Sequence, residues 1–256
     1  MSKVKVAQST DIPGFALAEV FPSIEGIGYD GVDYLSSVRN FYIKPKKILQ
    51  LSKKHNLPVI SIHQPKPLVA LHPKIFFKRM IHLLKFFPDV KISNYHLSGF
   101  MNILKNNPSA VKHFIQITKE HNATVTFESN PYVFTKLYPK ETYVPEQFGE
   151  FCTSHHLSMT FDTSHIADNG YDIVTFFKKY HKNISMIHLS DFHNGKEHLP
   201  LGEGSLPIKK LLQEIKNTSW NKLVVFEIKR FPGAKNKKNK LEYLKKSLDM
   251  VRKYTA

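Results

Sequence analysis

The feature that most constrains this chain is an alternation of short apolar runs with longer amphipathic segments, which continues to the C-terminus. β-Branched and apolar residues fill the short runs, as is typical of buried strands. The longer segments carry apolar residues three or four positions apart, as is typical of helices. The predicted strands are Val4–Ser9, Gly31–Leu35, Pro58–His63, Ile92–Leu97, Ala123–Glu128, Leu157–Asp162, Ile184–Leu189 and Leu223–Ile228. The predicted helices include Ile75–Phe86, Ala110–His121, Asp172–Lys182, Leu206–Ile215 and Leu241–Tyr254.

Strands that alternate with helices form parallel sheets with right-handed crossovers. Eight repeats exceed the roughly five or six strands of an ordinary open α/β sheet, and they favour closure into a barrel. The chain has 256 residues, of which 41% are hydrophobic, enough to bury a large core. We therefore predict the α/β class and a single (β/α)₈ TIM barrel, with residues 1–256 as one domain.

Cysteine content and hydropathy bear on the cellular compartment. Cys152 is the only cysteine, so no disulfide can form within the chain. No N-terminal run has the charged-then-apolar pattern of a signal peptide, and no apolar stretch approaches the roughly 20 residues of a membrane span. We expect a cytoplasmic protein that does not associate with membranes.

The formal net charge of +16 suits an anionic partner, either a nucleic acid or a phosphorylated metabolite. However, only four of the 37 basic residues are Arg, the residue that binds phosphate through two parallel hydrogen bonds. Biased amino-acid usage explains a lysine excess equally well, so the charge alone does not identify a partner.

Two longer segments interrupt the alternation. Residues Ser129–Pro145 contain three X–Pro steps and are too long for a simple connection, which makes them a candidate lid over a site. Residues Lys229–Lys240 contain Pro232-Gly233 and five lysines. They are predicted to form a solvated loop before the last helix, with phosphate binding as the less favoured alternative.

Metal-ligand side chains recur where predicted strands end. In a parallel barrel these ends meet at one mouth, where active sites are built. A single histidine or glutamate there is usually a hydrogen-bonded core or rim residue, but recurrence at successive strand ends favours a shared site. Three buried carboxylates need a cation, and oxygen and imidazole ligands without a thiolate suit Mn²⁺, Zn²⁺, Mg²⁺ or Co²⁺. The residues are His63, His96, Glu128, Asp162, His188 and Glu227.

Two local patterns extend this prediction. Asp162-Thr-Ser-His165 places two ligand-type side chains three residues apart as the chain leaves the sixth predicted strand. Asp191, three residues after His188, is predicted to support a metal ligand. The segment His198-Leu-Pro-Leu-Gly-Glu-Gly204 contains a glycine turn before a helix, which is predicted to present backbone N–H groups to an anion.

Four segments, in this order, resemble the xylose isomerase-like barrel superfamily, which joins sugar isomerases and epimerases to the endonuclease IV type of abasic-site nuclease. The resemblance implies, in the sugar epimerase branch, one divalent ion held by Glu128, Asp162, His188 and Glu227. It also implies that Glu128 and Glu227 are the catalytic pair that transfers the proton while the ion polarises the substrate oxygens. The segments are Phe161–Asp172, Ile187–Asp191, Pro200–Gly204 and Val225–Glu227.

The endonuclease IV branch is the alternative, and it implies a cluster of three zinc ions and DNA as the partner. Lys196 stands where that branch has an aspartate ligand, so the third zinc is expected to keep only His165 and His198. The segment Val6–Thr10 also lacks that branch's DNA-facing motif. We therefore predict a metal-dependent isomerase or epimerase of a small sugar, sugar phosphate or polyol. A barrel that only binds a ligand is a third hypothesis. Candidates for a second metal or for substrate contacts are His63, His96, His165, His198 and Lys196.

Overall fold

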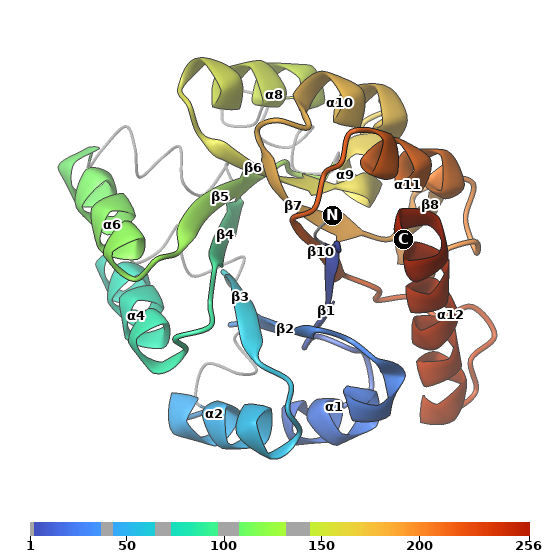
Figure 1. The fold of residues 1–256 in the computed structure, drawn as a ribbon, viewed down its shortest axis with the longest axis horizontal. Helices are drawn as coiled ribbons and strands as arrows, with labels where there is room; N and C mark the ends of the chain where they lie inside the picture. Colours follow the sequence, from blue (N-terminus) through green and yellow to red (C-terminus); the bar gives the residue numbers. More distant parts are fainter. Residues whose placement is uncertain (1–2, 37–42, 65–72, 97–107, 132–143) are drawn as a thin grey trace.

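Eight parallel strands close into a barrel in the computed structural model, which describes residues 3–36, 43–64, 73–96, 108–131 and 144–256. The strands are β1 (Lys5–Ser9), β2 (Gly31–Leu35), β3 (Val59–His63), β4 (Ile92–His96), β5 (Thr124–Glu128), β6 (Ser158–Asp162), β7 (Ile184–Leu189) and β10 (Leu223–Phe226). Around the barrel they follow the order β1, β10, β7, β6, β5, β4, β3, β2, and β2 pairs with β1. Figure 1 shows this ring viewed close to its axis. The predicted (β/α)₈ barrel is confirmed.

Helices surround the strands in an outer layer, with one exception, as Figure 1 shows. They are α1 (Leu17–Ile24), α2 (Pro45–Lys54), α4 (Pro73–Phe86), α6 (Pro108–Glu120), α8 (Pro145–Ser154), α9 (Thr163–Asp168), α10 (Ile173–Tyr180), α11 (Ile208–Asn217) and α12 (Lys237–Thr255). The exception is the short α9, which lies inside that layer beside β7 (Figure 1). A short 3₁₀ helix, η1 (Glu25–Ile27), follows α1, and an antiparallel hairpin of β8 (Asp191–His193) and β9 (Lys196–Leu199) follows β7. None of the described helices is long and apolar enough to cross a membrane.

Helix α11 shows why the helices pack on the barrel. Its buried residues are Ile208, Leu211, Leu212 and Ile215, a spacing that places all four on one face. Burying each such side chain contributes about 1.5–3 kcal/mol. Apolar side chains of the other helices and of the outward strand positions join the same core, which therefore lies between the two layers.

The barrel interior changes from apolar to polar along the strands. Alternate residues of a strand share one face, so Ile92, Asn94 and His96 on β4 all face inward. The layer at the strand starts is apolar and consists of Ala7, Ile60, Ile92, Met186, Leu223 and Val225. A buried polar layer follows, which includes Asp33, Ser61, Asn94, Thr126 and Thr160. Ligand-type side chains therefore lie at the C-terminal mouth, above a polar layer and an apolar floor.

Two predicted segments differ from the structure. The last barrel strand ends at Phe226 and not at Ile228, so Glu227 lies just beyond it. The predicted loop through Lys240 is wrong at its end, because α12 begins at Lys237, where the Asn236 side chain accepts a hydrogen bond from the backbone N–H of Asn239 at 2.9 Å. The candidate lid, Ser129–Pro145, lies mostly at residues 132–143, outside the described part of the chain.

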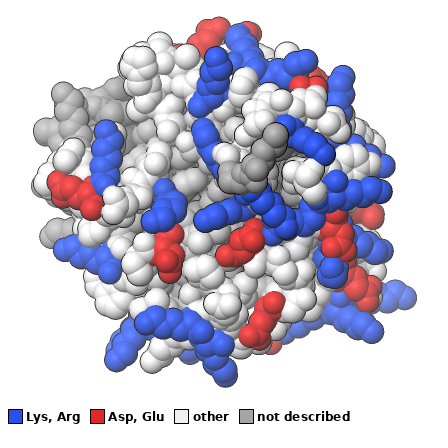
Figure 2. Space-filling model, in the orientation of Figure 1, with Lys and Arg blue, Asp and Glu red and all other residues white. Residues whose placement is uncertain are grey.

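Lys and Arg side chains cover much of the face in Figure 2 and gather around its centre and right side. Lys and Arg outnumber Asp and Glu by 37 to 21 in the sequence.

Candidate metal centre

The structure brings together the four predicted metal ligands Glu128, Asp162, His188 and Glu227. One ligand-type atom of each residue lies within 4.8 Å of the corresponding atom of the other three, and all four residues are buried. Glu128 and Asp162 are the last residues of β5 and β6. His188 is the last but one of β7, and Glu227 directly follows β10. The arrangement arises because parallel strands direct all their C-terminal ends to one mouth of the barrel.

Ligand-type atoms of these residues face one another. Among the described residues, no hydrogen bond reaches Glu128 Oε1, Asp162 Oδ2, His188 Nδ1 or Glu227 Oε2. His188 Nδ1 lies 3.3 Å from Glu128 Oε1, 3.9 Å from Asp162 Oδ2 and 3.0 Å from Glu227 Oε2. Buried polar atoms are nearly always satisfied, and three carboxylate oxygens around one imidazole nitrogen are the donor set of a divalent cation. These residues therefore fit a metal ion.

Glu128 lies between this group and a second one, formed by His63, His96 and Glu128 itself. Its Oε2 atom lies 3.4 Å from His63 Nε2 and 3.8 Å from His96 Nε2. Its Oε1 atom faces the first group and lies 3.3 Å from Nδ1 of both His165 and His188. The two oxygens of one carboxylate thus serve two adjacent groups.

A chain of hydrogen bonds fixes the orientation of Glu128. The Thr160 hydroxyl donates to that of Thr126 at 2.7 Å, which donates to Asn94 Oδ1 at 3.1 Å. Asn94 Nδ2 in turn donates to Glu128 Oε2 at 2.6 Å. The sequence prediction did not include Asn94, although it lies two residues before His96 and hence on the same strand face.

Asp162 has two separate roles because its two oxygens point in different directions. Oδ1 accepts hydrogen bonds from Ser164 N at 2.8 Å, His165 N at 3.0 Å and the Ser164 hydroxyl at 2.8 Å, and so caps the N-terminus of α9. Oδ2 remains for a cation. Since Asp162 Oδ1 is saturated by the cap, Asp162 offers one oxygen to the metal centre.

A third group consists of Asp162, His165 and His198. We expected only the two histidines to hold a third ion, and that expectation stays a prediction. Asp162 adds a third ligand-type atom, but it is shared with the first group. His198 is buried, and its burial lowers its pKa to about 4. Its ring is therefore neutral near pH 7 and suits either a metal or a substrate hydroxyl.

Lys229 is a cation beside the centre. Lys196 is exposed on β9 and paired in register with His193, and its role as a substrate contact stays a prediction. Lys229 Nζ forms an ion pair with Glu227 Oε1, and 25% of its side chain is exposed. Lys229 was not predicted, but it follows Glu227 by two residues, the spacing that places side chains on one side of extended backbone.

The charged groups of the centre shift one another's pKa values. Burial alone raises the pKa of Glu128, but His96 and His188 outweigh burial and hold this pKa well below its usual range. Burial likewise raises the pKa of Glu227, and Lys229 and His188 lower it further than burial raises it. Burial lowers the pKa of His188, whereas Glu128 and Glu227 raise it well above its usual value. Protonated His188 therefore provides a positive charge that a metal ion would replace.

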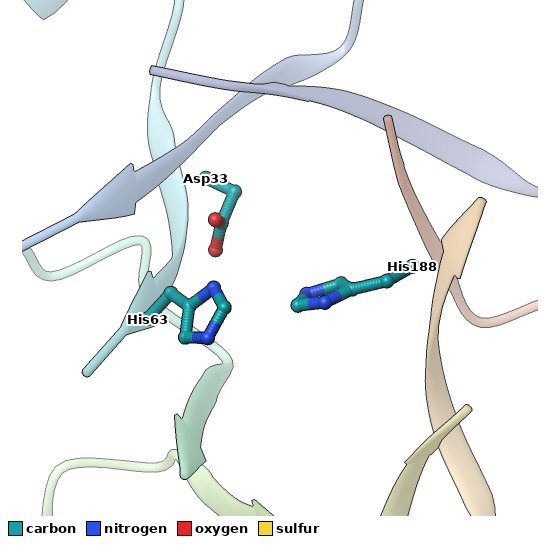
Figure 3. Close-up of side chains that lie close together, drawn as sticks. All are labelled: Asp33, His63 and His188. Carbon is teal, nitrogen blue, oxygen red and sulfur yellow. The ribbon is translucent and has the colours of Figure 1, made fainter. Parts of the chain in front are cut away.

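Asp33 is a further buried residue of the site that the sequence prediction missed. One ligand-type atom of Asp33 lies within 4.8 Å of those of His63 and His188, as drawn in Figure 3. Burial raises the pKa of Asp33, and the neighbouring His63 and His188 act in the opposite direction. An aspartate in the middle of a strand carries no local signal of such a contact.

Asp191 does not support a metal ligand, contrary to the prediction. Its carboxylate accepts hydrogen bonds from the backbone N–H groups of Phe192 at 2.8 Å, Gly202 at 2.9 Å and Leu206 at 3.0 Å. The glycine turn therefore binds the carboxylate of Asp191. A Cβ atom at Gly204 would lie 2.3 Å from Asp191 Oδ1, so the close approach requires glycine there.

Solved structures share the fold at low sequence identity. D-psicose 3-epimerase with D-tagatose from Clostridium cellulolyticum H10 has a TM-score of 0.73 and 13% identity, with 100% of this chain and 99% of that chain covered. 3-keto-D-glucoside 4-epimerase from E. coli has a TM-score of 0.71 and 14% identity, with 98% and 100% covered. AP endonuclease, family 2, from Brucella melitensis has a TM-score of 0.71 and 14% identity, with 94% and 96% covered.

Sequence comparisons identify the family. An uncharacterized protein of Methanocaldococcus jannaschii is 26% identical over 160 residues, which are 60% of this chain and 52% of that protein. The match thus spans about half the length of this curated relative. The model of the xylose isomerase-like TIM barrel family matches residues 21–254. The chain therefore belongs to the xylose isomerase-like TIM barrel family.

Proposed function

We propose that this protein is a divalent-metal-dependent isomerase or epimerase of a small sugar, sugar phosphate or related polyol. The observation that carries the proposal is the convergence of Glu128, Asp162, His188 and Glu227, whose unpaired ligand atoms lie within 4.8 Å of one another. Epimerases among the structural neighbours support the same class.

Glu128 and Glu227 transfer the proton in this proposal. The two side chains reach the centre from the end of β5 and from just after β10, strands separated by two others on one side of the barrel and by four on the other. In this proposal one glutamate removes a proton from a substrate carbon and the other returns one on the opposite side. A bound ion would polarise the carbonyl and hydroxyl oxygens of the substrate and so acidify the carbon-bound proton.

The pairing of Lys229 with Glu227 suits this chemistry. Lys229 keeps Glu227 ionised, as a proton acceptor must be, and its quarter-exposed side chain can also meet an anionic or hydroxyl group of the substrate. His198 is proposed as a neutral hydrogen-bonding contact for the sugar.

Abasic-site cleavage is the second candidate, and the two additional groups favour it. His63 and His96 share Glu128 with the first group, and His165 and His198 share Asp162 with it. A cluster of two or three zinc ions could therefore form around the shared carboxylates, and multi-metal sites of this kind are used for phosphodiester hydrolysis.

Metal stoichiometry and substrate assays on the same preparation separate the two candidates. The first measurement is the number of ions per chain after loading with Mn²⁺ or Zn²⁺. The second compares interconversion of ketohexoses and their phosphates with cleavage of a DNA duplex that contains an abasic site. We expect one tightly held ion and sugar interconversion.

Glu128→Ala is the control for contaminating enzymes in both assays, since it removes a residue of the proposed proton-transfer pair. Two or three ions per chain, together with duplex cleavage that Glu128→Ala abolishes, would replace the isomerase proposal with the nuclease.

A further inference from the structure

Asp33 is a buried carboxylate that the proposed reaction does not use. It lies inside the barrel on β2, in register with Ser61 on β3. The Ser61 hydroxyl donates to Asp33 Oδ1 at 2.7 Å, whereas Oδ2 has no hydrogen-bond partner among the described residues. A buried carboxylate oxygen is strongly disfavoured without a partner, so Oδ2 needs a donor.

Two imidazole rings approach this carboxylate from opposite walls of the barrel. His63 belongs to β3 and His188 to β7, and three strands separate these two in either direction around the ring. Figure 3 shows the carboxylate of Asp33 directed toward the space between the two rings. Asp33, His63 and His188 each place one polar atom within 4.8 Å of the other two.

Each ring already directs one nitrogen toward the candidate metal centre. His63 Nε2 lies 3.4 Å from Glu128 Oε2, and His188 Nδ1 lies 3.0 Å from Glu227 Oε2. The second nitrogens, His63 Nδ1 and His188 Nε2, have no hydrogen-bond partner in the described part of the chain. A neutral imidazole that binds a metal through one nitrogen carries its proton on the other, and that N–H group needs an acceptor.

We propose that Asp33 is a positioning residue of the metal centre, whose free Oδ2 atom accepts the N–H groups of His63 and His188. This contact fixes both rings in the tautomer that leaves the metal-facing nitrogen free, and it holds their orientation. A carboxylate oxygen can accept two hydrogen bonds. Where Asp33 Oδ2 and a ring nitrogen are too far apart for a direct hydrogen bond, one bridging water can connect them. The proposal rests on the proposed metal centre: in an isomerase with one ion the contact positions the ligand His188, and in a nuclease it positions His63 as a second ligand as well.

Asp33→Asn tests the proposal, because it keeps the shape of the side chain while removing the charge. The readouts are the Zn²⁺ dissociation constant from competition with a coloured chelator, the ion count, and the visible absorption spectrum of the Co²⁺ form. We expect metal affinity to fall about 10- to 100-fold at an unchanged ion count, as is usual when the carboxylate partner of a ligating histidine is removed. The Co²⁺ spectrum should change as the rings reorient.

Asp30→Asn is the matched control, because it removes the same charge three residues earlier. Asp30 is bound to Arg252 Nη2 at 2.6 Å and to the backbone N–H of Val6 at 2.7 Å, and it lies at the opposite end of the barrel. This variant should lose thermal stability and keep the metal affinity of the wild type. Equal affinity losses in Asp30→Asn and Asp33→Asn would overturn the proposal, as would an affinity of Asp33→Asn within about threefold of the wild type.

A drop in ion count on Asp33→Asn would also overturn the proposal, because Asp33 would then be a metal ligand.

If Asp33→Asn does not fold, Ser61→Ala serves instead, since it removes only the hydroxyl that anchors Asp33 Oδ1. It should weaken Zn²⁺ binding several-fold, and unchanged binding would count against the proposal. A wild-type protein that binds no divalent ion overturns the proposed function together with this inference. If the wild type binds a divalent ion and Asp33→Asn binds it with the same affinity, only this inference is overturned.

Discussion

Glu227 lies between two cationic groups, the ammonium of Lys229 on Oε1 and the imidazole of His188 3.0 Å from Oε2. This position explains how a carboxylate with 2% exposed side chain stays ionised. It also makes the two oxygens inequivalent, because one is committed to Lys229 while the other faces the centre. At the scale of single residues, the chemistry of the site depends on which oxygen of each carboxylate faces the centre.

Glu227→Gln should reduce kcat by about 10²- to 10⁴-fold while the protein keeps part of its metal affinity. The amide oxygen can still coordinate an ion, but the side chain can no longer accept a proton. Steady-state kinetics on the sugar substrate and a metal titration of the same preparation test this.

Glu25→Gln is the matched control for that variant, since Glu25 forms a glutamate–histidine pair of the same 3.0 Å length with His55, outside the metal centre. It should leave kcat unchanged. A loss in kcat of less than about tenfold for Glu227→Gln at full metal occupancy would exclude Glu227 as an acid or base, because such groups usually contribute far more.

At the scale of elements, α9 begins directly where β6 ends. Asp162 is the last residue of the strand and the N-cap of the helix, and this coincidence fixes the direction of its second oxygen. A strand end with no intervening loop leaves the carboxylate little freedom. The helix cap therefore helps to hold a proposed metal ligand in place.

Two substitutions at Asp162 should separate capping from metal binding. Asp162→Asn keeps a good cap, so the free energy of unfolding without metal should change little, while metal affinity falls sharply. Asp162→Ala should lose both, with about 0.5–2 kcal/mol of additional destabilisation from the missing cap. Chemical denaturation of the metal-free proteins and Zn²⁺ titrations provide the two readouts. Equal metal affinities of Asp162→Asn and the wild type would remove Asp162 from the centre.

At the scale of the whole molecule, the metal centre joins distant parts of the barrel. Its four proposed ligands come from β5, β6, β7 and the segment after β10, with Asp33 and His63 added from β2 and β3. An ion bound there crosslinks several strands, and unfolding separates its ligands. Metal binding should therefore be linked to global stability.

Saturation with Mn²⁺ or Zn²⁺ at about 100 times the dissociation constant should stabilise the fold by about 2.7 kcal/mol. For a chain of this size that corresponds to a rise in Tm of roughly 5–10 °C, measurable by scanning calorimetry with and without a chelator. Asp162→Asn should lose most of this rise. A rise that persists in full in that variant would place the binding elsewhere on the protein.

The sequence alone determined the barrel, because each strand–helix repeat is encoded by local periodicity and eight such repeats favour closure. It also predicted that Glu128, Asp162 and His188 end strands, since a strand end is a local feature. Glu227 was predicted to lie before the end of its strand, and it follows that end by one residue. The strand-end position of each residue is thus largely a property of its neighbours in the chain.

The tertiary structure decided which atoms meet. Glu128 serves two groups, Asp33 faces His188 across the barrel, and Asp191 is bound by its own turn. Asp33 and His188 lie on strands that are far apart in the chain, so no local pattern in the sequence reports their contact. Register, barrel closure and the positions of individual oxygens set these contacts, and all three depend on the packing of the whole chain.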